Sequence, residues 1–322
     1  MKNGSLIISL DFELFWGVRD LKNANDYRQG VIGAKQIIPK IVELFNQYDV
    51  KATFAIVGFL FCNSKEDIYK YSPLKKPSYK DKNLSPYEYG YIDNLSMNDH
   101  YLHFAGDIIE YLKSQINIEI GSHTFSHYYC TAEGQTVDEF EDDLNAAVAI
   151  SKDNNIELSS IVFPRNEVND EYLNVCANHN IYNYRGNPKK YFNKRSFFNR
   201  TMRFWDTYVN LDNQTMYNYD EIKQGEMYNV KASRFLRPYS KRFSFLEMLK
   251  IQRIKNEMKE AAINNQIYHL WWHPHNFGTN CDKNLSMLEE VLKHYSFLKK
   301  TYGMSSFGMN GLVNKLKNGD KI

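Results

Sequence analysis

Short apolar runs alternate along this chain with segments of helical periodicity, and this alternation restricts the possible folds more than any other feature. Residues 6–12 (LIISLDF) form a short apolar run of the kind that becomes a buried strand. Residues 31–48 instead carry apolar side chains at every third or fourth position, which predicts a helix. Strands that alternate with helices in this way predict a parallel sheet with helices packed outside it.

The same reasoning extends over most of the chain. It predicts strands at residues 6–12, 52–57, 116–121, 159–163, 181–184 and 266–272. It predicts helices at residues 31–48, 99–114, 136–153, 245–263 and 284–300. Thr136 and Glu139 form a capping-box pattern at the start of the third helix, and Asn169 can cap another. An open doubly wound sheet and a closed barrel both agree with this order of elements.

Two long segments interrupt the alternation. Residues 63–98 are polar and rich in Tyr, Lys and Pro, and residues 188–240 are aromatic, basic and irregular. Loops of this length in a compact domain usually serve as lids or binding loops. Because there is no internal repeat and no obvious linker, we expect residues 1–322 to form a single catalytic domain.

Charge, cysteine content and hydropathy exclude several classes of protein. The chain has 40 Lys and Arg against 38 Asp and Glu, a balance that does not predict a nucleic-acid partner. Its four cysteines show no C-x-x-C spacing, which predicts neither a disulfide framework nor a zinc ribbon. The apolar run at 6–10 is too short for a signal peptide, and no run approaches the roughly 20 residues of a membrane span. We therefore expect a cytoplasmic protein without a transmembrane segment.

Candidate catalytic residues follow the predicted strands, whose carboxyl ends meet at one face of a parallel α/β fold. Asp11 and Glu13 end the first strand, and residues two apart in a strand point to the same side. His123 and His127 follow the third strand at a spacing that places both imidazoles on one face of a turn. Two histidines with one carboxylate are typical of an open catalytic zinc site.

Two further clusters lie at strand ends. Pro164-Arg165-Asn166 follows the fourth strand, where Arg165 can hold a carboxylate and backbone N–H groups can face an oxyanion. The last strand ends in a segment rich in Trp and His, which suits a general acid beside a sugar-stacking wall. Its candidate residues are Trp272, His273, His275 and Asn276.

Taken together, the motifs L-D-F-E, H-T-F-S-H, F-P-R-N and L-W-W-H resemble those of the polysaccharide deacetylases, carbohydrate esterase family 4, from Asp11 to His275. The strings Y-R-G-N-P, S-R-F-L-R-P-Y and H-L-W-W-H-P-H-N-F-G look most like the cytosolic subgroup linked to O-antigen and other surface polysaccharides. The resemblance implies a distorted (β/α)7-type barrel with outer helices and two long loop insertions.

The resemblance also implies roles for individual residues. Glu13, His123 and His127 would hold a divalent metal ion, with Zn2+ as the expected ion. Asp11 would act as the base toward the metal-bound water, and His273 would act as the acid. The implied reaction is hydrolysis of an N-acetyl or N-formyl group on an amino sugar that is nucleotide-linked, lipid-linked or free.

The chain departs from the family pattern at three positions. Its first two acids are Asp11 and Glu13 rather than an adjacent pair, and Arg165 follows its proline rather than preceding it. The acidic residue that tunes the catalytic histidine has no clear counterpart, and Asp206 is the candidate. Basic residues beyond the fifth strand, including Arg185 and Arg237, could hold a substrate phosphate.

Two other functions remain compatible with these residues. One is a metal-dependent amidohydrolase that acts on a non-sugar amide or a cyclic ureide. The other is a non-catalytic glycan-binding barrel. The aromatic content of 15% is compatible with either a large core or a sugar-stacking surface.

Overall fold

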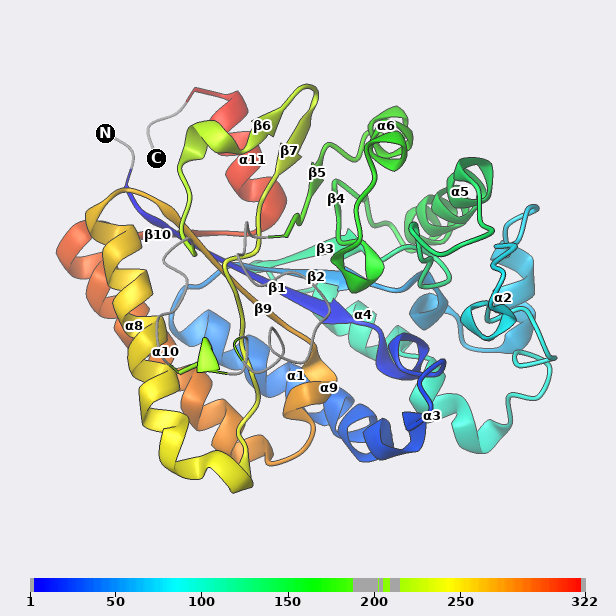
Figure 1. The fold of residues 1–322 in the computed structure, drawn as a ribbon, viewed down its shortest axis with the longest axis horizontal. Helices are drawn as coiled ribbons and strands as arrows, with labels where there is room; N and C mark the ends of the chain where they lie inside the picture. Colours follow the sequence, from blue (N-terminus) through cyan, green and yellow to red (C-terminus); the bar gives the residue numbers. More distant parts are fainter. Residues whose placement is uncertain (1–2, 188–201, 203–204, 209–214, 320–322) are drawn as a thin grey trace.

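The computed structural model describes residues 3–187, 202, 205–208 and 215–319. Its centre is a mostly parallel sheet that curls into a half-barrel with helices around it (Figure 1). This confirms the predicted α/β class and the distorted (β/α) barrel. The strands are β1 (Ser5–Phe12), β2 (Ala52–Ile56), β3 (Ile118–Ser122), β4 (Ser160–Ile161), β5 (Asn183–Tyr184), β6 (Lys223–Gln224), β7 (Met227–Asn229), β8 (Arg234–Phe235), β9 (Ile267–Trp272) and β10 (Ser305–Phe307).

The strand order places β1 at the centre of the fold. The order is β6-β7-β5-β4-β3-β2-β1-β9-β8, and among the described strands only β6 and β7 pair antiparallel. The carboxyl half of β1 pairs with β2, while the amino half of the same edge pairs with β10. Since β1, β2, β3 and β9 run in parallel, their carboxyl ends share one face, which is where the motif residues begin.

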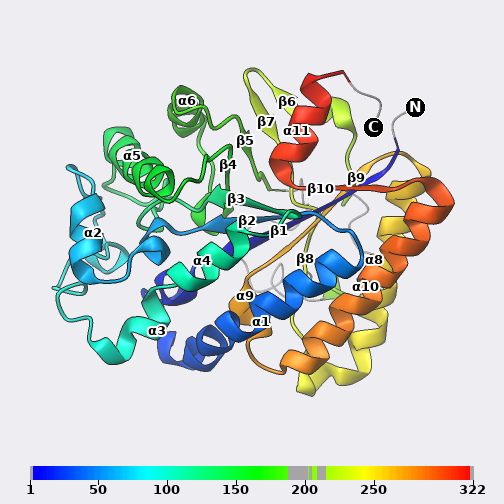
Figure 2. The same ribbon diagram turned by 180° about the vertical axis from the view of Figure 1, so that it is seen from behind.

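Helices cover the outside of the curled sheet. They are α1 (Arg28–Gln47), α2 (Lys65–Tyr71), α3 (His100–His103), α4 (Gly106–Lys113), α5 (Val137–Asp153), α6 (Asp170–Asn178), α8 (Glu247–Ile263), α9 (Pro274–Phe277), α10 (Cys281–Tyr302) and α11 (Met309–Lys317). Figure 2 shows α1, α10 and α8 lying side by side on one side of the sheet. Within the described part of the chain, no helix combines the length and apolar character needed to cross a membrane.

Several elements differ from the sequence prediction. The helix predicted at 99–114 is two helices, because the chain turns at Ala105, whose N–H donates to the carbonyl of Leu60 at 2.9 Å. The segment 188–240, expected to be irregular, contains β6, β7 and β8, although 188–201, 203–204 and 209–214 lie outside the described residues. Neither β10 nor α11 was predicted, since β10 has only three residues and no apolar run.

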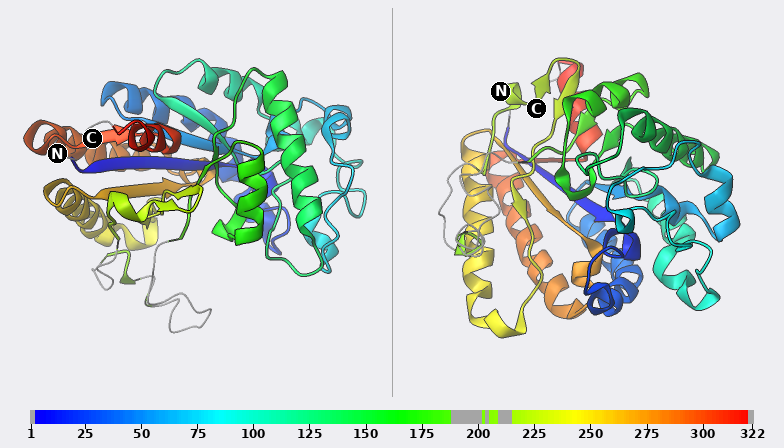
Figure 3. Two further views of the ribbon diagram at one scale, coloured as in Figure 1. Left: turned by 90° about the horizontal axis from the view of Figure 1, so that it is seen from above. Right: turned by 45° about the vertical axis from the view of Figure 1, so that its right-hand side comes forward.

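Alternation along β1 separates the hydrophobic core from the polar interior of the half-barrel. The even-numbered residues of β1, from Leu6 to Phe12, belong to the main apolar core. The other face presents Ile7, which belongs to a smaller apolar cluster with residues of α11. Figure 3 shows α11 at the end of the sheet where β1 begins. Ser9 and Asp11 follow on this second face, toward the carboxyl end of the strand.

A close backbone contact fixes the segment after β9 against α1. A Cβ atom built on Gly33 of α1 would lie 2.0 Å from the carbonyl oxygen of Gly278, so a side chain at Gly33 would collide with backbone. The lack of a side chain at Gly33 therefore lets α9 and the preceding His273 approach α1 closely.

Candidate metal-dependent active site

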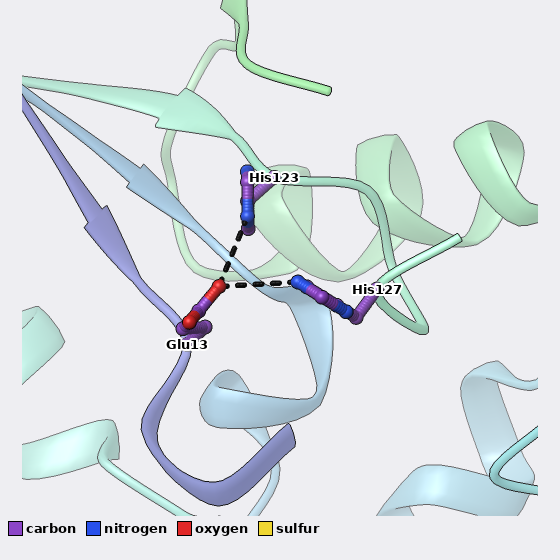
Figure 4. A group of neighbouring side chains, drawn as sticks. All are labelled: Glu13, His123 and His127. Carbon is purple, nitrogen blue, oxygen red and sulfur yellow. Dashed lines mark hydrogen bonds and ion pairs between the residues drawn. The ribbon is translucent and has the colours of Figure 1, made fainter. Parts of the chain in front are cut away.

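Three side chains with metal-ligating atoms meet beyond the carboxyl ends of β1 and β3 (Figure 4). Glu13 follows β1, while His123 and His127 lie in the segment after β3. Oε2 of Glu13 is 3.3 Å from Nε2 of His123 and 3.1 Å from Nε2 of His127. One ligand atom from each residue lies within 4.8 Å of the other two, so the structure brings the expected set close enough to share one ion.

The chemistry of these donors fits a divalent cation. Nδ1 of His123 is 2.7 Å from the carbonyl oxygen of Val162, which can only accept, so Nδ1 carries the proton and Nε2 carries a lone pair. His127 in the same tautomer would point a second lone pair at the Glu13 carboxylate. Two lone pairs and a carboxylate repel one another unless a cation or an added proton lies between them. Neutral imidazole nitrogens with one carboxylate are the usual donors of an open zinc site.

Burial and charge reinforce these protonation states. Burial raises the pKa of Glu13, but the charge of His273 and the contacts with His123 and His127 outweigh it and hold that pKa well below its usual range. Burial lowers the pKa of His127, which favours the neutral imidazole that a metal requires.

A buried carboxylate shapes the loop that carries both histidines. Asp143 of α5 accepts hydrogen bonds from the backbone N–H groups of Phe125 and Ser126 at 2.7 and 3.0 Å. Within this loop Thr124 and His127 have φ angles of 64° and 60°, the left-handed region that L-residues adopt only when neighbours hold them there. Burial raises the pKa of Asp143 to about 6.

Asp11, the expected base, is paired with Arg185 inside the half-barrel. Two guanidinium nitrogens of Arg185 donate to the two carboxylate oxygens of Asp11 at 2.7 and 2.6 Å. Burial raises the pKa of Asp11, but the Arg185 charge outweighs it and the pKa is lowered. The other N–H groups of Arg185 donate to Ser9 and Asn166, so all five are used. A phosphate role for Arg185 is therefore wrong, and the Asn166 side chain holds Arg185 instead of facing substrate.

Arg165 points elsewhere than the sequence suggested. It has a φ of 58°, and its guanidinium donates to Oδ2 of Asp20 at 2.7 Å and lies 3.9 Å over the ring of Tyr129. The carboxylate that Arg165 was expected to hold near the reacting atoms is held by Arg185, which follows β5. The reason is local, because the left-handed turn at Arg165 and Asn166 directs the two side chains to different neighbours.

His273, the expected acid, lies on the other side of the carboxylates. Its Nε2 is 3.7 Å from Oδ2 of Asp11 and 3.7 Å from Oε1 of Glu13. Its Nδ1 lies 3.1 Å from Oδ1 of Asn276, which accepts a hydrogen bond from Nδ1–H and orients the ring. Trp271 packs edge-on to His273 with ring centroids 5.6 Å apart. The His273 side chain is 23% exposed, so its Nε2 can reach a substrate.

Comparison with known proteins agrees with this geometry. The family model described as Polysaccharide deacetylase matches residues 29–184, a stretch that contains His123 and His127. The match and the fold support a polysaccharide deacetylase family domain. No curated protein matches this chain.

Solved structures share the fold at low sequence identity. A protein from Mycobacterium smegmatis described as a polysaccharide deacetylase superposes with a TM-score of 0.55 at 9% identity, over 99% of this chain and 93% of that one. A GH57-type branching enzyme from Pyrococcus horikoshii gives 0.53 at 10% identity, over 99% and 71%. A 4-alpha-glucanotransferase from Thermococcus litoralis gives 0.53 at 8% identity, over 98% and 41%. At these identities the likeness shows the fold.

The expected sugar-stacking residue is off by one position. Trp272 is fully buried in the apolar core, stacked on Phe277 with ring centroids 5.4 Å apart, and cannot contact a substrate. Trp271 occupies the opposite face of β9, beside His273, and its ring lies 4.2 Å from the Arg185 guanidinium carbon. Strand alternation is the physical reason, because adjacent residues of β9 point to opposite faces.

His275 is also buried, behind His273. The two rings stack with centroids 5.0 Å apart, and Nδ1 of His275 lies 3.9 Å from Oε1 of Glu13. Burial lowers the pKa of His275 to about 4, so the ring is neutral. The structure therefore places His275 against Glu13 and places Asn276 against His273, rather than either on an open binding surface.

Asp206 belongs to a buried ion-pair cluster with Arg234 of β8 and with Arg253 and Glu257 of α8. Its carboxylate lies 2.9 Å from Arg253 and 4.0 Å from Arg234, while Arg234 also pairs with Glu257 at 2.5 Å. The prediction that Asp206 tunes the catalytic histidine is wrong, since Asn276 is the partner of His273 Nδ1. Arg237 follows β8, where its carbonyl accepts from Lys250 at 2.9 Å, and its phosphate role stays a prediction.

Sequence reasoning missed several residues that support the site. Ser9, His269 and Trp271 lie on the inner face of their strands, and Ser9 Oγ is 2.8 Å from Nε2 of His269. Counting by twos from Asp11 and from His273 would have identified all three. Asp20 and Tyr129 carried no such signal, because they lie in irregular segments.

Proposed function

We propose that this chain is a metal-dependent hydrolase that removes an N-acetyl or N-formyl group from an amino sugar, with Zn2+ as its metal. The observation that carries the proposal is the convergence of two imidazole nitrogens on the carboxylate of Glu13, at 3.3 and 3.1 Å. The polysaccharide deacetylase family match supports the same reaction class. A divalent cation held by Glu13, His123 and His127 supplies Lewis acidity toward water and the amide oxygen.

Asp11 acts as the base in this proposal. Hydrolysis forms a bond between the water oxygen and the acyl carbon, and Asp11 accepts the proton that the water gives up. Arg185 keeps Asp11 ionised and fixes both carboxylate oxygens by its bidentate contact. The lowered pKa of Asp11 keeps the carboxylate ionised over a wide pH range, so the group is present in its proton-accepting form.

His273 completes the reaction as the acid. The acyl C–N bond breaks, and Nε2–H of His273 donates a proton to the departing nitrogen, which leaves poorly without one. Asn276 keeps Nδ1–H of His273 occupied, so Nε2 is the nitrogen that faces the two carboxylates. The products are a free amino sugar and acetate or formate.

The substrate proposal rests on the resemblance and on a partly exposed aromatic wall formed by Trp271 and Phe235. Trp271 and Phe235 lie edge to face with ring centroids 4.8 Å apart, and each flanks His273, which suits packing against a pyranose ring. We propose an amino sugar of surface-polysaccharide biosynthesis that is free, nucleotide-linked or lipid-linked. The strings Y-R-G-N-P and S-R-F-L-R-P-Y support that subgroup.

Metal analysis tests the centre directly. Wild-type protein should contain about one equivalent of zinc per chain, and His127→Ala should contain almost none. His294→Ala is the matched control, because His294 lies on α10 and hydrogen-bonds the carbonyl of Lys255. Full hydrolytic activity after complete chelation would contradict the mechanism.

A substrate panel with mass detection tests the reaction. We expect loss of acetyl or formyl from at least one N-acyl amino sugar, and a fall in kcat of about 10²–10⁴-fold in His273→Ala. Opening of a cyclic ureide without sugar deacylation would replace the proposal with the non-sugar amidohydrolase. A zinc-loaded protein that binds glycans but turns over none of the panel would identify a non-catalytic barrel.

A further inference from the structure

A chain of hydrogen bonds leads from the buried metal ligand His127 to Arg165 at the surface. Nδ1 of His127 lies 3.1 Å from the hydroxyl of Tyr129, and that hydroxyl lies 3.2 Å from Oδ1 of Asp20. Oδ2 of Asp20 accepts from the guanidinium of Arg165 at 2.7 Å. The Tyr129 residue is 2% exposed and the Asp20 side chain is 3% exposed, so water does not readily replace these contacts.

Arg165, at one end of this series of hydrogen bonds, determines which group donates and which accepts in each bond. Arg165 can only donate, and the Asp20 carboxylate that it contacts can only accept. The Tyr129 hydroxyl must therefore donate to Asp20, and its remaining lone pairs face His127. Nδ1 of His127 then carries the proton, and Nε2 presents its lone pair toward Glu13.

The two metal-ligating histidines obtain this tautomer by different means. His123 donates Nδ1–H to a backbone carbonyl, that of Val162 at 2.7 Å, which no side-chain substitution removes. His127 depends on a side-chain hydroxyl that could donate or accept. The Asp20 carboxylate beyond Tyr129 determines whether this hydroxyl accepts from His127 or donates to it. If the hydroxyl donated to Nδ1, the proton of His127 would be on Nε2 and would point at the metal position.

We propose that Tyr129 and Asp20 are positioning residues that select the metal-binding tautomer of His127, with Arg165 anchoring Asp20. This gives Arg165 a role three hydrogen bonds away from the ligand and not at the reacting atoms. The inference rests on the metal site of the proposed function, but it concerns a proton position that can be measured separately.

Zinc affinity in the Tyr129→Phe variant is the first test. Competition with a chromogenic chelator should show zinc binding weakened about 10–100-fold, the usual effect of removing an outer partner of a ligating histidine. Tyr128→Phe is the matched control, because this adjacent buried hydroxyl bonds Gln135 and the carbonyl of Thr136 instead. Circular dichroism melting verifies that both variants fold. Equal zinc affinity in the two variants would overturn the proposal.

The tautomer itself is the second test and requires no metal. Two-dimensional 1H–15N spectra of the metal-free wild type should show a proton on Nδ1 of both His123 and His127, in addition to any proton that replaces the cation between Nε2 and Glu13. In Asp20→Asn we expect the Nε2–H form of His127 to appear while His123 is unchanged, since an amide can donate to Tyr129 and reverse its hydroxyl.

The two tests separate this inference from the proposed function. Wild-type protein that binds no zinc would contradict the proposed function, and the tautomer spectra would still decide the role of Tyr129. Unchanged spectra in Asp20→Asn would overturn the positioning role even if zinc binding and deacylation are confirmed in the wild type.

Discussion

The guanidinium of Arg185 contacts both carboxylate oxygens of Asp11, at 2.7 and 2.6 Å, across a separation of 174 residues in the sequence. Both side chains are buried, and the pair lies between the polar interior of the half-barrel and the proposed metal centre. This contact keeps a carboxylate ionised where burial alone would favour its protonated form.

Removal of the Arg185 charge should therefore change the pH dependence of catalysis. In Arg185→Gln the pKa of Asp11 loses the charge that lowers it, so the base is protonated at higher pH. We expect the acidic limb of kcat/KM to move upward by about one to three pH units. Arg242→Gln, an exposed arginine before α8, is the control. An acidic limb that stays in place in Arg185→Gln would refute the assignment of Asp11 as base.

Replacement of the two adjacent tryptophans should have different consequences. Trp272→Ala removes a fully buried ring from the core and should lower the free energy of unfolding by about 3–5 kcal/mol. Trp271→Ala removes the partly exposed ring beside His273 and should raise KM several-fold at a smaller stability cost. Urea denaturation and steady-state kinetics on both variants measure the contrast, and a reversed pattern would show that the aromatic wall is misplaced.

His269 should make stability depend on pH. Burial, followed by the Arg185 charge, lowers the pKa of His269 to about 3, whereas the pKa of histidine in an unfolded chain is about 6.5. The unfolded state therefore binds more protons below about pH 6.5, so this stabilisation is complete above that pH and is lost as the pH falls toward 3.

Urea titrations of wild type and His269→Asn at pH 7 and pH 5 measure this effect. The wild type should lose about 2 kcal/mol more than the variant between the two pH values. The comparison uses the change in the free energy of unfolding between pH 7 and pH 5. It is therefore informative even though the smaller side chain of the variant lowers that free energy at both pH values. The same change in the free energy of unfolding in both proteins would show that His269 is not held neutral in the folded state.

Asp206 should matter for stability rather than for catalysis. Asp206→Ala leaves buried arginines with one carboxylate fewer, and we expect the free energy of unfolding to fall by about 3 kcal/mol. The exposed Asp220 is the control, since Asp220→Ala should change stability by less than about 0.5 kcal/mol. Turnover per folded Asp206→Ala molecule should equal that of the wild type, and a large loss of kcat would restore Asp206 as a catalytic candidate.

The local sequence pattern was sufficient to predict those elements whose structure depends mainly on their own residues. The apolar runs predicted β1, β2 and β9 to within one residue at either end, and the capping box at Thr136 and Glu139 is present at the start of α5. The short strands β6, β7 and β8 were not predicted, because two or three residues carry too little periodicity to be recognised.

The sequence by itself also indicated the chemical groups of the site. Glu13, His123 and His127 follow predicted strands of a parallel sheet, and residues of these types at strand ends indicate a metal site. Which arginine meets Asp11, which tryptophan faces His273 and which hydroxyl orients His127 were decided only by the tertiary structure. The physical reason is that side-chain direction depends on strand parity and on turns such as the one at Arg165, and partners far apart in sequence leave no local pattern.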